Sequence, residues 1–145
     1  LLVNGDFIDF LSEIEPSPTT KSVCGSAHST LRSKLEKHET YKVIHVNTYL
    51  SGSYARNTAL RPRQSNGTVR RPDVDIIVVT NHTQSDLPSN VIATLRKAVR
   101  SLGYQEVEAN RRSICVSLGA VEMDVGANLA SKGGKPRAWV RFAHF

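Results

Sequence analysis

One short segment, Asp73 to Val79, restricts the fold more than any other part of this 145-residue sequence. It begins Asp-Val-Asp and continues Ile-Ile-Val-Val, and such an unbroken apolar run is typical of a strand that is covered on both faces. Because alternate strand residues share a face, Asp73 and Asp75 point the same way, with Cα atoms roughly 6.5 to 7 Å apart. We expect this strand to lie centrally in a sheet.

Carboxylates this close repel each other, by about 4 kcal/mol at about 4 Å and an effective dielectric constant near 20. A cation between Asp73 and Asp75 would remove that cost. The alternative is that Asp73 caps a loop while Asp75 pairs with a nearby arginine.

Two helices and a further strand are predicted before this segment. Apolar residues at helical spacing indicate a short first helix that ends at Pro16; they are Phe7, Phe10, Leu11 and Ile14. A longer helix is expected from about Thr19 to His38. Its predicted packing face consists of Val23, Ala27, Leu31 and Leu35. Tyr41 to Leu50 favours a strand, residues 54–58 a helical turn or two, and residues 61–72 a loop.

A helix and three short strands are predicted after it. The helix runs from Leu87 to Leu102, with Pro88 near its start and Gly103 at its end. The strands cover residues 104–109, 113–118 and 121–125, with Gly119-Ala120 as a hairpin turn. The expected architecture is α+β, a mixed central sheet flanked by helices.

A Ser51-Gly52-Ser53 segment stands where the strand 41–50 gives way to the helical turn. Backbone amides at a helix N-terminus and a serine hydroxyl can bind a phosphate oxygen, and glycine allows close approach. The alternative is a serine N-cap preceded by a turn glycine.

A third carboxylate, Asp124, lies in the alternating segment Val121 to Val125, where Glu122 and Asp124 share one face. If this strand lies beside the first, three carboxylates gather, a set that fits two hard cations about 3.5 to 4 Å apart. The alternative is a solvated acidic face on an edge strand.

The charge balance favours a polyanionic partner. The chain has 19 Lys and Arg against 13 Asp and Glu, a formal net charge of +6. The excess is local, so solvated loops are the alternative; the clusters are Arg61, Arg63, Arg70 and Arg71, and Arg96, Lys97, Arg100, Arg111 and Arg112. Cys24 and Cys115 are interpreted as buried thiols. Without a signal peptide or an apolar run of roughly 20 residues, we expect a cytoplasmic protein that does not enter a membrane.

Three runs occur in the order Gly52-Ser53-Tyr54-Ala55-Arg56-Asn57-Thr58-Ala59-Leu60-Arg61-Pro62, Asp73-Val74-Asp75-Ile76-Ile77-Val78-Val79, and Met123-Asp124-Val125. Together they resemble the bacterial relatives of cyclic GMP-AMP synthase and oligoadenylate synthase, the anti-phage cyclic oligonucleotide synthases of the polymerase beta-like nucleotidyltransferase superfamily. Asn57 replaces the family's usual glycine, which is tolerable because asparagine adopts positive φ more readily than most residues.

The resemblance implies an enzyme that joins nucleoside triphosphates, ATP, GTP or another, into a cyclic di- or trinucleotide and releases pyrophosphate. It implies that Gly52 and Ser53, with the adjoining Ser51, grip the triphosphate. It also implies that Asp73, Asp75 and Asp124 hold two Mg²⁺ ions, for which Mn²⁺ can substitute, and that the third carboxylate activates the attacking ribose hydroxyl. A regulatory protein or nucleic-acid activator is a further expected partner.

The resemblance covers about residues 6 to 130. We therefore expect residues 1–130 to form the catalytic lobe, and residues 131–145 a loop or tail that begins a second lobe missing from this chain. Two alternatives stay open: a transferase that modifies a protein or RNA, of the antitoxin or tRNA type, and a catalytically silent module that binds nucleotide or nucleic acid.

Overall fold

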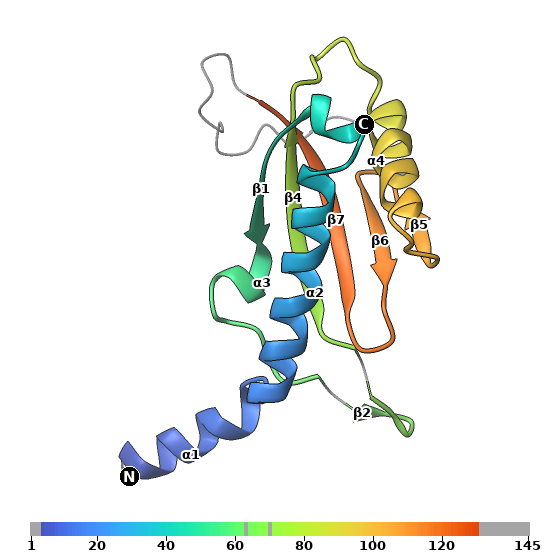
Figure 1. Ribbon diagram of the computed structural model, residues 1–145. Helices are drawn as coiled ribbons and strands as arrows, with labels where there is room; N and C mark the ends of the chain where they lie inside the picture. The colour runs from blue at the N-terminus through green and yellow to red at the C-terminus, as the bar shows by residue number, and fades with distance from the viewer. Residues whose placement is uncertain (1–3, 63, 70, 131–145) are drawn as a thin grey trace.

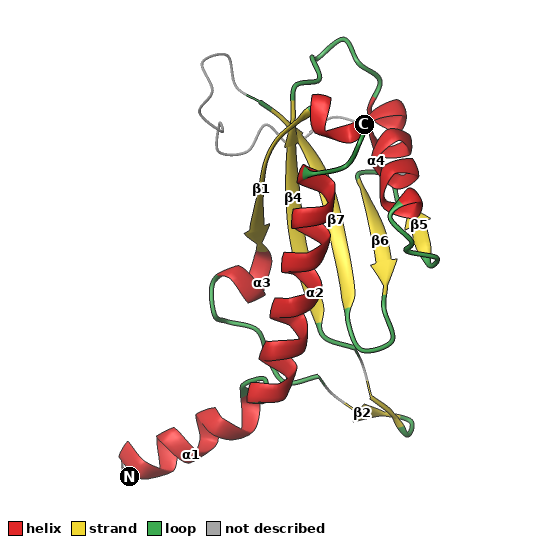
Figure 2. Ribbon diagram, in the orientation of Figure 1, coloured by secondary structure: helices red, strands yellow, loops and turns green. Residues whose placement is uncertain are grey.

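The computed structural model describes residues 4–62, 64–69 and 71–130. Its centre is a mixed five-stranded sheet of order β1-β4-β7-β6-β5, with α2 and α4 packed against one face (Figures 1 and 2). The strands are β1 (His45–Ser51), β4 (Asp73–Thr80), β5 (Val107–Ala109), β6 (Ser113–Ser117) and β7 (Glu122–Leu129). The helices are α1 (Asn4–Ile14), α2 (Pro18–Glu36), η1 (Tyr41–Val43), α3 (Gly52–Ala55) and α4 (Pro88–Ser101).

The long predicted helix is α2, and Ser17 caps it by accepting a 3.1 Å hydrogen bond from the Thr20 amide. Its predicted packing face is partly wrong, because Val23 is 37% exposed. The buried residues are Cys24, His28, Leu31 and Leu35. The predicted residues are each four apart, and because the helix has 3.6 residues per turn, such a series moves gradually around its surface. The buried residues are four, three and four apart, which keeps them on one face.

The predicted strand from Tyr41 begins later than expected. The 3-10 turn η1 covers Tyr41–Val43, and β1 starts at His45. His38 Nδ1 accepts a 3.0 Å hydrogen bond from the Tyr41 amide, and the Tyr41 ring is only 2% exposed. The buried ring and this bond hold the segment in a turn, away from the sheet ladder.

The predicted loop 61–72 contains a small hairpin, β2 (Gln64–Ser65) and β3 (Thr68–Val69). Asn66 and Gly67 form its turn with φ of 52° and 77°, as an Asn-Gly hairpin requires. The sequence signal for this hairpin was present at Asn66-Gly67.

The helix predicted at 87–102 is α4, and Gly103 follows it with a φ of 99°, as predicted. Leu118 and Val121 exchange backbone hydrogen bonds of 2.9 and 3.3 Å across Gly119-Ala120, which confirms that hairpin turn. Two strands differ from expectation: β5 starts only at Val107, and β7 extends four residues past Val125 to Leu129.

The core lies between the helices and one face of the sheet. Residues that face the helices are fully buried, among them Leu95 of α4, Ile76 of β4 and Met123 of β7. Residues on the opposite face of β4 and β7 are mostly half-buried, so the expectation that β4 is covered on both faces is confirmed for one face only. The predicted tail 131–145, and Arg63 and Arg70 of the basic cluster, lie outside the described residues.

Candidate active site

The Ser51-Gly52-Ser53 segment lies at the junction of β1 and α3. Ser51 ends β1, and α3 begins at Gly52, two residues earlier than the predicted helical turn. Gly52 has a φ of +69°, and a Cβ built there would overlap the Asp75 carboxylate, 2.9 Å from its Cγ. Position 52 therefore needs glycine twice, for its backbone conformation and for the close approach of Asp75.

The chain after α3 folds back onto this junction. Asn57 has a φ of 56°, which confirms that asparagine adopts the left-handed conformation here. The Ser53 carbonyl accepts hydrogen bonds from the Thr58 amide, at 2.9 Å, and from Thr58 Oγ1, at 3.3 Å. These bonds fix the course of the segment that leads to Arg61.

Arg61 ties the same segment to the end of α1. Its amide donates to the Ile14 carbonyl at 2.6 Å, its Nε to the Glu15 carbonyl at 3.1 Å, and its Nη2 to the Ser12 carbonyl at 3.0 Å. Ser12 and Ile14 lie in the last turn of α1 and Glu15 directly follows it, so the helix provides no partners for these carbonyls.

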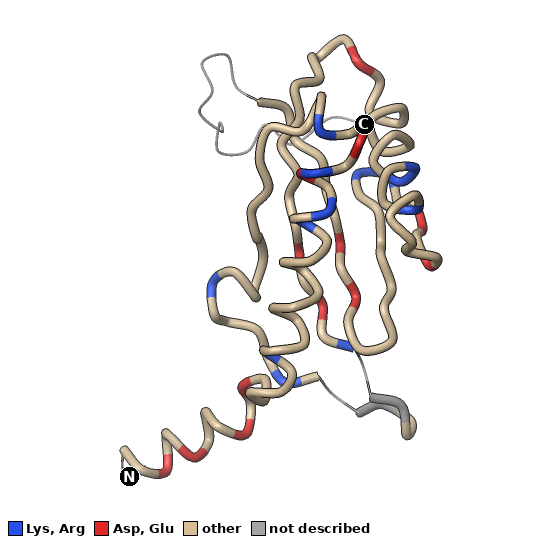
Figure 3. Tube along the Cα trace, in the orientation of Figure 1, with Lys and Arg blue, Asp and Glu red and all other residues tan. Residues whose placement is uncertain are grey.

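The three predicted carboxylates come from neighbouring strands. β4 and β7 pair in parallel, with Asp75 opposite Asp124 and Asp73 opposite Glu122. On its other side Asp75 lies opposite Ser51 of β1. β7 is an internal strand, so the alternative of an acidic face on an edge strand is wrong. Figure 3 shows the acidic positions side by side on β4 and β7.

The carboxylates disfavour each other's ionisation. Burial, and then the charge of Asp124, raises the pKa of Asp75, and Arg56 offsets this in part. Burial, followed by Asp75, Asp124 and Glu122, raises the pKa of Asp73. The sequence pattern placed Glu122 on the strand face of Asp124, but Glu122 was not named as a residue of the site.

Asp124 has a further partner that the sequence did not indicate. Ser113 of β6 donates a 2.6 Å hydrogen bond from Oγ to Asp124 Oδ1. Cys115 lies directly opposite Asp124 in the register, and its thiol is half-buried where a buried one was predicted, whereas Cys24 is buried as predicted.

The donor set fits magnesium, because hard cations take carboxylate oxygens and these carboxylates share one face in register. This fit refers to the chemical type of the ligand atoms and not to a completed coordination site. Within residues 4–62, 64–69 and 71–130, no three His, Cys, Asp or Glu side chains are gathered so as to hold a metal ion.

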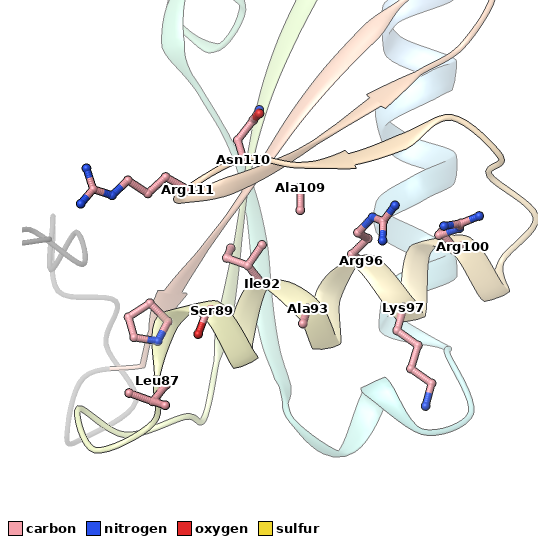
Figure 4. A pocket seen from close by; sticks show the side chains of 11 residues that line it. Leu87, Ser89, Ile92, Ala93, Arg96, Lys97, Arg100, Ala109, Asn110 and Arg111 are labelled. Atoms are coloured by element: carbon pink, nitrogen blue, oxygen red, sulfur yellow. The ribbon is translucent and has the colours of Figure 1, made fainter.

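A hollow of about 830 Å³ lies elsewhere, between α4 and the end of β5 (Figure 4). It gathers four of the five residues of the second basic cluster, Arg96, Lys97, Arg100 and Arg111, and none of the carboxylates. A smaller cavity of about 270 Å³ adjoins the site, lined by Ser53 and Asp73 together with Arg61 and Arg71. The carboxylates lie outside this larger hollow, and its size alone does not supply reactive groups.

In the described part of the chain, no helix combines the length and apolar character needed to cross a membrane.

Comparison with known proteins adds three findings. The family model of the Second Messenger Oligonucleotide or Dinucleotide Synthetase domain matches residues 2–136. A cyclic AMP-AMP-AMP synthase from an Acinetobacter strain is 51% identical over 119 residues, 82% of this chain and 35% of that protein. A cyclic AMP-AMP-GMP synthase from Enterobacter hormaechei is 34% identical over 134 residues, 91% of this chain and 34% of that protein. The chain thus spans about a third of the length of the curated relatives it matches.

The solved structure of E. coli CdnC in complex with HORMA-deltaN has a similar fold. The TM-score is 0.68 at 19% identity, with 87% of this chain and 41% of that chain covered. This similarity confirms the predicted α+β, polymerase beta-like fold with its mixed sheet.

Proposed function

The chain belongs to the second messenger oligonucleotide or dinucleotide synthetase family, and on that premise we propose that the complete protein is a metal-dependent nucleotidyltransferase. It joins nucleoside triphosphates into a cyclic di- or trinucleotide and releases pyrophosphate. The observation that carries this proposal is the register of β4 and β7, which sets Asp75 beside Asp124 on the strand face that Asp73 also shares.

Asp73, Asp75 and Asp124 are the proposed ligands of two Mg²⁺ ions, with Mn²⁺ as a substitute. Bound there, the ions would neutralise the carboxylates and stabilise the charge that builds up on the reacting phosphate. The proposed role of the Ser51-Gly52-Ser53 segment is to bind the triphosphate. The close approach of Gly52 to Asp75 supports this role. Because glycine has no side chain, the backbone of the segment lies directly beside the carboxylate of a proposed metal ligand. Asp124 is also the proposed acceptor of the ribose hydroxyl proton.

The proposed substrates are ATP, with or without GTP or another nucleoside triphosphate, because the matched relatives are named for products that contain AMP and GMP. We further propose that the product is a signal in anti-phage defence in the cytoplasm. A regulatory protein or a nucleic acid is the proposed activator, and the CdnC complex with HORMA-deltaN supports the first of these.

The test is incubation of the complete protein with labelled ATP and GTP and Mg²⁺, followed by identification of products. The wild type is expected to release pyrophosphate and form a product resistant to phosphatase, as a ring without terminal phosphate must be. Asp73→Asn/Asp75→Asn is the matched control and should form none. Equal turnover by that variant would overturn the mechanism. Transfer of label to RNA or protein would identify the transferase alternative, and salt-sensitive nucleic-acid binding without turnover the silent module.

A further inference from the structure

Ser113 holds Asp124 through a contact between strands. It begins β6, and its register partner on β7 is Gly126, with Asp124 two residues away. Alternate residues share a face, so Ser113 and Asp124 are diagonal neighbours across the strand pair. Glycine places no side chain opposite Ser113, which leaves room for the serine to lean toward Asp124. The resulting Oγ to Oδ1 distance is 2.6 Å.

This bond is suited to fixing a carboxylate. A hydroxyl that donates to an ionised carboxylate at such a distance makes a charge-assisted bond, stronger than one between neutral groups. It engages one oxygen and sets the plane of the carboxyl group, while the second oxygen can still bind a cation. The directly opposite residue is Cys115, whose thiol is a weak donor by comparison.

We propose that Ser113 is a positioning residue that orients the Asp124 carboxylate for metal binding. The inference rests on the proposed function, since it assigns Asp124 as a ligand. Partners that hydrogen-bond a ligating carboxylate hold it in its binding orientation, and their loss usually weakens metal affinity about 10- to 100-fold. Ser113 therefore acts through Asp124 and contacts neither substrate nor ion.

The test compares three variants of the complete protein. Ser113→Ala removes the hydroxyl, and Ser113→Thr restores it with a side chain that suits a strand. Ser117→Ala is the matched control: it removes a hydroxyl from the same face of β6, four residues on, opposite Glu122. Mn²⁺ affinity is measured directly by electron paramagnetic resonance in the absence of nucleotide. Thermal unfolding in EDTA reports the stability of each fold.

We expect Ser113→Ala to bind Mn²⁺ about 10- to 100-fold more weakly, Ser113→Thr to recover most of the affinity, and Ser117→Ala to match the wild type. In turnover, Ser113→Ala should need correspondingly more Mg²⁺, with an unchanged KM for ATP at saturating Mg²⁺. A purely structural role would lower the unfolding temperature in EDTA and leave Mn²⁺ affinity unchanged, which overturns the inference. Unchanged or tighter binding by Ser113→Ala overturns it as well.

Failure of the proposed function has a different signature. Asp73→Asn/Asp75→Asn would then bind Mn²⁺ as the wild type does. If that variant loses Mn²⁺ while Ser113→Ala keeps it, only the role of Ser113 is wrong.

Discussion

Gly52 and Asp75 lie so close that any side chain at position 52 would overlap the Asp75 carboxylate. Gly52 begins α3 directly after β1, and Asp75 of β4 is the register partner of Ser51, the last residue of β1. The proposed triphosphate-binding segment and the proposed metal ligands are thus parts of one structural unit. A substitution in the triphosphate-binding segment should therefore also displace the metal ligands.

Gly52→Ala tests that unit. Alanine must adopt a φ of +69° and also displace Asp75, so we expect a loss of about 1–3 kcal/mol in unfolding free energy and loss of most of the turnover. The matched control is Gly25→Ala in α2, where an added Cβ meets nothing within 4 Å. That helix position should gain about 0.5–1 kcal/mol. Denaturant unfolding measures both, and equal effects at the two glycines would contradict this account.

Arg61→Ala tests the link between the same segment and α1. The variant loses the two hydrogen bonds from Nε and Nη2 to the Glu15 and Ser12 carbonyls, so the end of α1 should fray. Hydrogen exchange in α1 should accelerate while α4 keeps its protection. Arg61→Lys should behave like the alanine variant, because one ammonium cannot replace the planar guanidinium fork. Full protection of α1 in Arg61→Lys would show that charge, and not geometry, holds the helix.

The sequence predicted the parts of this fold that depend on local periodicity. The alternation from Val121 to Val125 predicted which face Asp124 occupies, and Pro88 with Gly103 predicted the ends of α4. It could not predict the start of β1, because the Tyr41 turn is held by burial and by His38. Nor could it predict Ser113, which lies 11 residues from Asp124. That contact depends on the strand register, a tertiary feature, which sets Gly126 opposite Ser113.

His28 makes stability depend on pH. It is 9% exposed, its Nδ1 has no hydrogen-bond partner within the described residues, and burial followed by Arg32 lowers its pKa. The unfolded chain therefore takes up a proton before the folded chain does. The stability that neutral His28 contributes is fully present above about pH 6.5. It is lost as the pH falls through the lowered pKa of the folded state, and the free energy of unfolding then decreases by up to about 1.4 kcal/mol per pH unit.

His28→Gln should flatten the stability profile below about pH 6.5, whatever its effect at pH 8. The measurement is the free energy of unfolding from urea titrations across this range. His45, whose pKa burial also lowers, should account for part of the remaining slope. A His28→Gln profile parallel to that of the wild type would exclude His28 as the titrating group.

Repulsion among the carboxylates predicts opposite effects with and without metal. Burial, and then the charge of Asp124, raises the pKa of Asp75, so the ionised carboxylates destabilise the metal-free fold near neutral pH. In EDTA, Asp75→Asn should therefore unfold at a higher temperature than the wild type, because it removes one repelling charge and keeps a similar shape. In excess Mn²⁺ the order should reverse, since only the wild type keeps all three ligands. Asp86→Asn is a control for loss of one acidic charge, because Asp86 lies in the turn before α4 and bonds Thr83. If Mn²⁺ raised the unfolding temperature of the wild type and of Asp75→Asn equally, the carboxylates would be close neighbours without being a metal site.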